Sequence, residues 1–354
     1  MTLAELRQAI DHCDEQIVAL LNERTRHVLK IGDLKREAGQ EIYAPHRERA
    51  VLQRVSKLNS GPITDASLHH IYREIMSSAL ALEKPMKVAY FGPEATFTHQ
   101  AAIRRFGSSL PYVAMKTISD VFTEVAKARA DYGVVPVENS TEGVVTHTLD
   151  MFVDSELKIV AQIILPIQQC LLSKATQREA IKRLYSHPQA LAQCRQWVQV
   201  HMPAAEVIEA SSTTRAAELA ARSRTAGAIA SALAAERYRL NLIEADIQDN
   251  SSNATRFLVL GRQCGPSTGR DRTSIIFSVA DEVGSLYRAL EPLSKHRVNM
   301  TRIESRPSKR RAWAYFFFVD VKGHAEDPVL ARALKELSRH CSFVKVLGSY
   351  PDAG

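Results

Sequence analysis

The chain has 354 residues, which at roughly 150 residues per domain predicts two or three domains. Its 45% hydrophobic and 24% charged residues are typical of a globular protein with buried cores, and they exclude disordered and fibrous classes. No stretch approaches the 18 or so consecutive apolar residues of a membrane span, and the N-terminal sequence MTLAELRQAIDHCDEQ carries charges where a signal peptide is apolar. We therefore expect a cytoplasmic protein without a membrane partner.

Basic residues outnumber acidic ones by 46 to 39, for a net charge of +7. Such an excess can indicate a nucleic acid or a small anionic substrate. No long basic block occurs, and residues 1–84 contain basic and acidic residues in equal number, so we expect no nucleic-acid partner. The five cysteines lack the spacing of zinc or redox sites, which predicts no metal site and buried thiols in a reducing compartment.

Residues 1–84 predict helices, because apolar side chains recur at three- and four-residue steps from Leu3 onward and no Pro or Gly precedes Gly32. We expect a long first helix that ends near Gly39, a second from residue 45 or 46 to 58, and a third from 64 to 83. The apolar stripe of the first helix is too long for the two following helices to cover. This mismatch predicts a second copy of the chain, in a homodimer or a higher homo-oligomer.

The pattern changes after residue 85 to short apolar strands followed by helices, which predicts an α/β domain with strands KVAYFG, YGVVPV, AGAIAS and RFLVLG. Polar loops at 92–98, 138–143 and 211–215 lead toward helices, where free N–H groups bind anions or hydroxyls cap the helix. No Walker A or GxGxxG motif occurs, so nucleotide binding has no support. After a linker, residues 272–350 predict a βαββαβ unit.

Two basic residues of the first helix share one face. Arg24 and Lys35 are 11 residues apart, which is about 20° past three full turns and about 16 Å along the axis. They could bind the two ends of a small dianion, whereas solvated surface charges are the alternative. Arg7 lies about 100° off this line and would reach a site on another chain more easily.

The stretch LRxxIDxxDxxIxxLLxER, the lysine that follows and the Arg47-Glu48 pair resemble the helical chorismate mutase family over residues 1–84. The resemblance implies that Arg7 and Arg24 clamp substrate carboxylates, one from each subunit. Lys35 would bind the ether oxygen and a carboxylate. Glu48 would hold the substrate hydroxyl, supported by Arg47.

The rearrangement of chorismate to prephenate suits such residues. It is unimolecular, so cations and hydrogen-bond donors suffice to hold a compact conformer and stabilise charge across the breaking C–O bond. The sequence departs from one form of the family pattern at Ala44, Ala79 and Glu83. Glu83 replaces a glutamine that donates to the ether oxygen, so it would act only when protonated. We therefore expect mutase activity to fall as the pH rises above neutrality.

The segments VAYFGPEATFTHQAA, GVVPVENSTEGVV, YSHPQALAQC and NATRF resemble prephenate dehydratase over about residues 86–263. The resemblance implies two α/β lobes, like those of a periplasmic binding protein, and matches Thr255 to the essential threonine of the family. Prephenate loses carbon dioxide and its ring hydroxyl together, so Thr255 would donate a hydrogen bond or relay a proton to the leaving group. The candidate substrate contacts are Thr96, Asn139, Ser140, Thr213 and Arg256.

Four further positions in this segment bear on the site. Gln162 and Gln169 stand where a Glu and a His are common in the family, which affects fine positioning more than the reaction. His99 and His187 are alternative proton donors, but lone histidines near loops are more often structural.

Residues 272–350 resemble an ACT domain, a module that binds amino acids at dimer interfaces. The resemblance rests on Gly284-Ser285-Leu286 and on Glu304-Ser305-Arg306-Pro307. It implies feedback inhibition by phenylalanine, whose carboxylate would meet backbone N–H groups at a glycine-led helix start. Residues 309–311, Lys-Arg-Arg, form either an anion patch or a solvated turn.

Together these features predict a multidomain chain: an all-α mutase domain (1–84), a two-lobed α/β dehydratase domain (86–263) and an α+β ACT domain (272–350). We expect a bifunctional enzyme, an isomerase and a carbon-oxygen lyase, that makes prephenate from chorismate and phenylpyruvate from prephenate without metal or organic cofactor. Two alternatives remain. One is a regulatory binding protein that senses metabolites, and the other is a dehydratase whose mutase has decayed.

Overall fold

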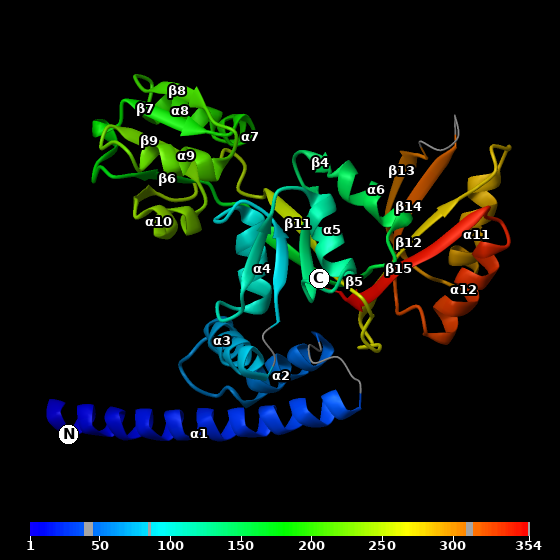
Figure 1. Ribbon diagram of the computed structural model, residues 1–354, viewed down its shortest axis with the longest axis horizontal. Coiled ribbons are helices and arrows are strands. Elements are labelled where there is room, and N and C mark those ends of the chain that lie inside the picture. Colours follow the sequence, from blue (N-terminus) through cyan, green and yellow to red (C-terminus); the bar gives the residue numbers. More distant parts are fainter. Residues whose placement is uncertain (39–44, 84–85, 309–313, 353–354) are drawn as a thin grey trace. The chain divides into compact units, whose positions relative to one another are not determined.

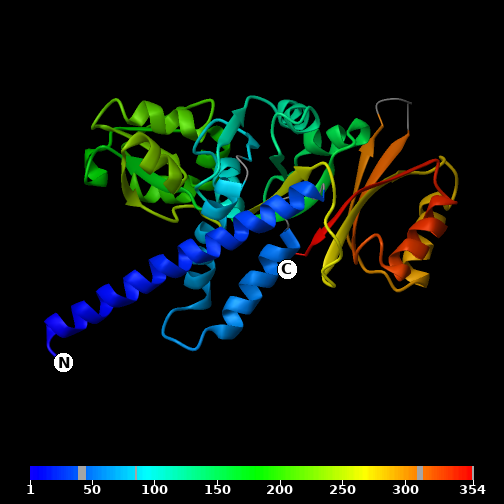
Figure 2. The same cartoon turned by 60° about the horizontal axis from the view of Figure 1, so that its bottom comes forward.

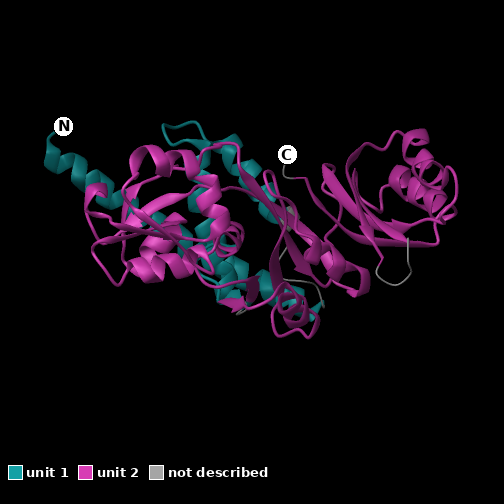
Figure 3. Cartoon of the chain, turned by 90° about the horizontal axis from the view of Figure 1, so that it is seen from above, with its two compact units in different colours: residues 1–87, 106–111 teal, residues 88–105, 112–354 magenta. Residues whose placement is uncertain are grey.

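The computed structural model describes residues 1–38, 45–83, 86–308 and 314–352. The chain divides into two compact units (Figure 3), of which one comprises residues 1–87 with 106–111 and the other residues 88–105 with 112–354. Each unit is described by itself.

The first unit consists of the three predicted helices, α1 (Leu3–Glu37), α2 (Pro45–Leu58) and α3 (Asp65–Glu83). A capping box starts α1, where the Thr2 hydroxyl accepts from the Glu5 N–H at 3.3 Å and the Glu5 carboxylate accepts from the Thr2 N–H at 2.7 Å. Figure 2 shows α1 as one uninterrupted rod. Its apolar side chains stay exposed on the single chain, among them Leu3, Leu6, Ile10, Ile17, Leu20, Ile31 and Leu34.

The second unit begins with a sheet of strand order β2-β1-β3-β11-β5, with β4 beside β3 (Figure 1). Its strands are β1 (Val88–Phe91), β2 (Tyr112–Met115), β3 (Tyr132–Asn139), β4 (Gly143–Val144), β5 (Lys158–Pro166) and β11 (Ala254–Gly261). Helices α4 (Phe97–Phe106), α5 (Ile118–Ala126) and α6 (Thr146–Asp154) accompany it. We call this part lobe 1. The β1–β2 and β1–β3 pairs are parallel, whereas β11 is antiparallel to β3 and β5.

Lobe 2 has a sheet of order β10-β6-β9-β7-β8. Its elements are β6 (Cys170–Ser173), η1 (Arg178–Ala180), β7 (Arg183–Ser186), α7 (Pro188–Gln193), α8 (Arg195–His201), β8 (Glu206–Glu209), α9 (Thr213–Ala220), β9 (Ala226–Ala230), α10 (Ala232–Tyr238) and β10 (Asn241–Glu244). Two crossing segments join the lobes and bond to each other. The Ile167 N–H donates to the Asn253 carbonyl at 2.8 Å, and the Ile247 N–H donates to the Gln169 carbonyl at 3.0 Å.

The C-terminal part has the predicted βαββαβ order: β12 (Asp271–Ser278), α11 (Ser285–Lys295), β13 (Met300–Pro307), β14 (Tyr315–Lys322), α12 (Pro328–Ser338) and β15 (Phe343–Pro351). The antiparallel sheet runs β13-β14-β12-β15, so β13 is an edge strand. Apolar residues of α11 and α12, including Ala289, Leu293 and Leu330, form a core with one face of the sheet.

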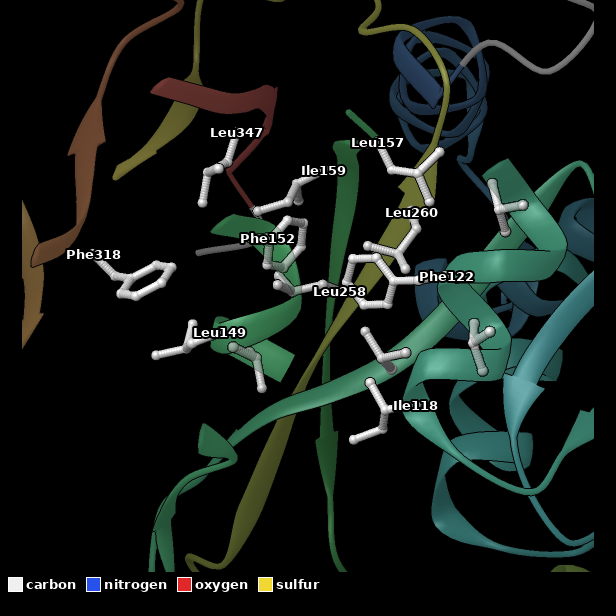
Figure 4. Close-up of a cluster of buried hydrophobic side chains, with 14 of the residues drawn as sticks. Ile118, Phe122, Leu149, Phe152, Leu157, Ile159, Leu258, Leu260, Phe318 and Leu347 are labelled. Atoms are coloured by element: carbon white, nitrogen blue, oxygen red, sulfur yellow. The ribbon is translucent and has the colours of Figure 1, made fainter. Parts of the chain in front are cut away.

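The other face of this sheet packs on lobe 1. Figure 4 shows Phe318 and Leu347 in the same buried cluster as Phe152, Ile159 and Leu258. At residue 348 the chain has a glycine with a φ of +155°, and a Cβ added there would lie 2.2 Å from the Ile159 carbonyl oxygen. The backbones of β15 and β5 therefore approach more closely than a side chain at this position permits.

These observations confirm the predicted fold class. One local prediction was wrong: Glu138 and Asn139, expected in a loop, are the last two residues of β3. Both residue types are rare in strands, and here pairing with β11 extends the strand despite their low propensity. The predicted end of α1 at Gly39 lies outside the described residues.

Candidate active sites

The strongest constellation in lobe 1 joins Asn139 and Thr255, which stand opposite each other in the β3–β11 ladder. The Asn139 side-chain amide donates from Nδ2 to Thr255 Oγ1 at 2.8 Å and to Asn253 Oδ1 at 2.9 Å. Asn139 and Thr255 are each only 9% exposed. Because the Thr255 oxygen accepts a hydrogen bond, its own O–H is polarised and free to donate to another group.

The orientation of the Asn139 amide is fixed by the loop that follows it. Its Oδ1 accepts from the backbone N–H groups of Thr141 at 2.9 Å and Glu142 at 3.0 Å, so Nδ2 must face Thr255. Ser140 ties the same loop to β11, since its Oγ accepts from the Ala254 N–H at 3.0 Å and its N–H donates to the Ala254 carbonyl at 2.9 Å. The donor that faces Thr255 is thus preorganised.

Asn253 belongs to this cluster, although it was not among the site residues predicted from the sequence. It is 2% exposed, and its Nδ2 is a buried donor that has no hydrogen-bond partner among the described residues. An unpaired buried polar group costs about 1–3 kcal/mol, so such a donor beside Thr255 is a candidate to bind a substrate oxygen. Its position in the NATRF motif, two residues before Thr255, is the sequence feature that could have identified it as a site residue.

Arg256 lies on the opposite face of β11 from Thr255. Its guanidinium donates to Gln162 Oε1 at 2.9 Å, to Asp320 Oδ2 at 2.6 Å and to the Tyr350 hydroxyl at 3.0 Å. Consecutive strand residues point to opposite faces, so this group cannot join the Asn139–Thr255 cluster. The geometry does not support the predicted substrate contact of Arg256, and Gln162 also lies on this far face.

Two other predicted contacts gather where the loop of residues 92–98 meets α9. Thr96 caps α4, because its Oγ1 donates to the Pro93 carbonyl at 3.0 Å and accepts from the His99 N–H at 3.3 Å. Thr213 is the first residue of α9. Beside it, Thr214 donates from Oγ1 to the Glu94 carbonyl at 3.0 Å, which brings this loop and the start of α9 together.

Both alternative histidines have structural surroundings, as does Gln169, whose side chain donates to Gln193 Oε1 at 3.1 Å. His99 stacks on Tyr90 with ring centroids 4.4 Å apart, and burial lowers its pKa. His187 is the N-cap of α7 and accepts from the Gln189 N–H at 3.3 Å. A lowered pKa keeps His99 neutral, which makes it a poor proton donor.

In the helical unit, Glu83 at the end of α3 lies directly against α1. A Cβ added at Gly32 would lie 2.4 Å from Glu83 Cγ, so the glycine makes room for this side chain. Burial raises the pKa of the Glu83 carboxyl, and the charges of Lys35 and Arg36 offset part of that increase. Among the described residues, Glu83 Oε1 and Arg24 Nη1 are both buried without a hydrogen-bond partner.

The other predicted mutase residues lie on the helices as follows. Arg7 is exposed on α1, Arg47 is exposed on α2, and Glu48 is half-buried beside it. Of the two alanines that depart from the family pattern, Ala79 is buried in α3, whereas Ala44 lies outside the described residues.

The predicted effector residues occupy the start of α11 and the edge strand β13. Gly284 is the N-cap of α11 with a φ of +77° and no side-chain cap, while Ser285 accepts from Arg288 Nη2 at 3.2 Å and Leu286 packs in the helix–sheet core. On β13, Arg306 contacts Asp150 of α6 at 3.4 Å.

Along β13, Glu304 shares the face of Arg306, whereas Ser305 and Pro307 alternate to the other. The basic run at residues 309–311 lies outside the described residues.

Two kinds of feature are absent from the described ranges. Within them, no group of three or more His, Cys, Asp or Glu side chains could hold a metal ion. No helix of the described part is long and apolar enough to cross a membrane.

Comparison with known proteins identifies three family matches along the chain. Residues 6–84 match chorismate mutase type II, residues 88–265 match prephenate dehydratase, and residues 273–339 match the ACT domain. A bifunctional chorismate mutase/prephenate dehydratase from Aquifex aeolicus is 51% identical over 99% of this chain and 98% of its own length. The chain belongs to the bifunctional chorismate mutase/prephenate dehydratase family. It therefore has both enzyme activities, and a regulatory binding protein without catalysis is excluded.

Two further members of the comparison agree with this assignment. The bifunctional chorismate mutase/prephenate dehydratase of Neisseria gonorrhoeae is 45% identical over 98% of this chain and 96% of its own length. A crystal structure of prephenate dehydratase in complex with L-Phe from Arthrobacter aurescens is 34% identical, covers 76% of this chain and 90% of that chain, and has a TM-score of 0.70.

Proposed function

We propose that Thr255 is the acid group of the dehydratase and that Asn139 activates it. As the carboxylate leaves prephenate as carbon dioxide, the electron pair of the broken C–C bond enters the ring and the ring C–O bond breaks. The departing hydroxide takes the proton of the Thr255 hydroxyl and leaves as water, and a solvent proton then restores the threonine hydroxyl, so that phenylpyruvate, carbon dioxide and water are the products. The observation that carries this role is the 2.8 Å hydrogen bond from Asn139 Nδ2, which stabilises negative charge on the Thr255 oxygen.

The neighbours of this pair would hold the two substrate carboxylates. Asn253 offers a buried amide donor that no described residue accepts from, and Ser140 keeps the loop of Asn139 against β11. The N-terminal ends of α9, near Thr213, and of α4, which Thr96 caps, are suited to the second carboxylate.

The test compares Thr255→Val and Thr255→Ser with Thr148→Val. Thr148 is a matched control, because it is another buried threonine of lobe 1, and its hydroxyl donates to the Pro136 carbonyl at 2.6 Å. Loss of the Thr255 hydroxyl should lower dehydratase kcat by about 10²–10⁴-fold, as for removal of a general acid. Thr255→Ser should retain most activity, and Thr148→Val should lose only stability. Equal kcat in Thr255→Val and the control would refute the role.

For the mutase we propose a site made by two copies of the chain, with the domain spanning residues 1–84. Arg24 and Lys35 would bind the substrate of their own subunit and Arg7 that of the partner. Two observations support this arrangement: Arg24 Nη1 is buried without a hydrogen-bond partner in the described part of the chain, and the apolar stripe of α1 is exposed. Glu48, with Arg47 beside it, would hold the substrate hydroxyl, and protonated Glu83 would donate to the ether oxygen.

Lys35→Ala should abolish conversion of chorismate while prephenate is still consumed. Sedimentation should show a homodimer, and a chain that remains monomeric yet active would refute the shared site. We also propose a cytoplasmic location for this enzyme.

We propose that the ACT domain, residues 272–350, binds phenylalanine and thereby inhibits the dehydratase domain, residues 86–263. The start of α11 at Gly284, which has no side-chain cap, would receive the amino-acid carboxylate, although the Ser285 N–H itself donates to the Glu282 carbonyl at 3.1 Å. Leu286 and Glu304 would be further contacts of the ligand. The relative from Arthrobacter aurescens, crystallised with L-Phe, supports an amino-acid ligand. Calorimetric titration of the full-length protein with phenylalanine tests this, with tyrosine as the comparison ligand.

A further inference from the structure

Among the ion pairs between the ACT sheet and lobe 1, two join a strand of one sheet to a strand of the other. Arg256 of β11 donates to Asp320 of β14 at 2.6 Å, and Arg302 Nε of β13 lies 3.0 Å from Glu138 Oε2 of β3. Each sheet supplies one acidic and one basic residue, and in both sheets these two stand directly opposite each other across neighbouring strands. We call such a pair of residues, opposite each other on neighbouring strands, a rung. The charged rung of lobe 1 and the charged rung of the ACT sheet therefore face each other with complementary charges.

On lobe 1, the charged rung lies next to the rung that carries the dehydratase site. Glu138 and Arg256 are paired in register, and the next pair along the same two strands is Asn139 and Thr255. The side chains of the two rungs point to opposite faces of the sheet. A shift of the strand ends that moves Glu138 or Arg256 must also move the donor and acceptor of the 2.8 Å bond.

On the ACT side, the charged rung belongs to the strand that carries the predicted effector residues. Arg302 is two residues before Glu304 on β13 and shares its face, and Arg306 on that face contacts Asp150 of lobe 1. Strand β13 is at the edge of its sheet, and within the described ranges it pairs through its backbone with β14 only. A ligand bound along β13 would thus act directly on Arg302.

Glu138 can interact with both arginines. Its carboxylate oxygen is 3.0 Å from Arg302 Nε and 3.9 Å from Arg256 Nη1, and Arg302 Nη2 is buried without a hydrogen-bond partner among the described residues. Asp320 is held more firmly, because Ser274 also donates to it, at 2.5 Å. The charges that face Glu138 thus permit a second arrangement, in which it moves from Arg302 toward Arg256.

We propose that Glu138 and Arg302 are positioning residues that couple the state of β13 to the Asn139–Thr255 pair. A ligand that moves Arg302 would release Glu138 and shift the end of β3. The Asn139 amide would then lose its alignment with the Thr255 hydroxyl. This coupling rests on the proposed phenylalanine site, and it requires that phenylalanine bind the two arrangements with different affinity.

The test uses full-length Glu138→Gln, Arg302→Gln, Arg302→Lys and the double variant Glu138→Gln/Arg302→Gln. Lys295→Gln is the matched control, since it removes an exposed ion pair of the same 3.0 Å length, to Glu336, inside the ACT domain. Calorimetry measures phenylalanine binding, and prephenate consumption measures kcat and KM with and without phenylalanine. Thermal unfolding confirms that each variant is folded.

Glu138→Gln and Arg302→Gln should still bind phenylalanine. The factor by which phenylalanine lowers kcat should be smaller than in the wild type by about fivefold or more. The double variant should lose no more inhibition than the more affected single variant, because each single substitution already breaks the same Glu138–Arg302 interaction. Arg302→Lys should recover part of the inhibition, and Lys295→Gln should behave as wild type. Wild-type inhibition in a Glu138→Gln protein that binds phenylalanine would refute the coupling alone. Absence of phenylalanine binding by the wild type would refute the effector site and the coupling together.

Discussion

Thr255 and Arg256 are consecutive residues of β11 that point to opposite faces of the lobe 1 sheet. The hydroxyl of Thr255 accepts a hydrogen bond from Asn139, whereas the guanidinium of Arg256 is buried against Asp320 of the ACT sheet. Substitutions at these neighbouring positions should therefore have different consequences, one for the chemical step and the other for the junction between domains.

Removing the amide of Asn253 should impair substrate binding. Asn253→Ala removes the unpartnered buried donor, so KM for prephenate should rise by about tenfold, as expected for loss of one hydrogen bond worth about 1.4 kcal/mol. Steady-state kinetics with prephenate measures this. Asn250→Ala is the control, because Asn250 lies in the same segment but bonds within it, to Ser252. A rise of equal size in both variants would contradict the role.

The junction between the domains should depend on Asp320. Arg256 and Asp320 are both buried, so Asp320→Ala removes the nearest carboxylate of a buried arginine and leaves only Glu138, at 3.9 Å, as its acidic neighbour among the described residues; the free energy of unfolding should fall by up to about 3–5 kcal/mol. Glu336→Ala removes the acid of an exposed pair with Lys295, an acid that also contacts His296, and the free energy of unfolding should change much less than in Asp320→Ala. Urea unfolding compares the two variants. Equal midpoints would show that the buried pair does not stabilise the junction.

Because β15 approaches β5 closely, we expect that any side chain at residue 348 destabilises the protein. In Gly348→Ala, the new methyl group would meet the Ile159 carbonyl oxygen. The free energy of unfolding should therefore fall by about 1–3 kcal/mol or more. Gly61→Ala is the matched control, since a Cβ at that position has no neighbouring atom within 4 Å. The thermal midpoints of the two variants check this. If the midpoint of Gly61→Ala fell as far as that of Gly348→Ala, crowding at residue 348 would be excluded as the cause.

The raised pKa of Glu83 predicts the pH dependence of the mutase. Burial favours the neutral carboxyl, so the folded chain holds this proton above the ordinary pKa of 4.5. As the pH rises from 4.5 through the raised pKa, the donor to the ether oxygen is lost, and both mutase kcat and the stability of the helical unit should fall. Glu83→Gln should make the profile flat. A wild-type rate that climbs steadily from about pH 5 to 9 would remove Glu83 from the site.

The helices and the C-terminal unit were predictable because their patterns are long. Apolar residues recur through all of α1, and the ACT strands alternate over about eight residues each. The four-residue strands of lobe 2, such as β7 and β8, were not predicted, because so short a segment shows no period. Their place depends on pairing with strands distant in the sequence.

The site was predictable as residues but not as geometry. Thr255, Asn139 and Ser140 came from motifs, whereas the bond between Asn139 and Thr255 joins residues 116 positions apart and depends on the β3–β11 register. Arg256 was placed beside Thr255 because the two share a motif. Residues 254–261 form a strand, and consecutive strand residues point to opposite faces of a sheet, so this alternation alone places the two side chains on different faces.

In the proposed reaction sequence, one chain makes prephenate and then uses Thr255 to consume it. The most direct measurement supplies only chorismate to the wild type and to Thr255→Val and follows chorismate, prephenate and phenylpyruvate over time. We predict that both proteins consume chorismate at the same rate, that the wild type accumulates phenylpyruvate, and that Thr255→Val accumulates prephenate instead. Phenylpyruvate formation by Thr255→Val at the wild-type rate would contradict the account.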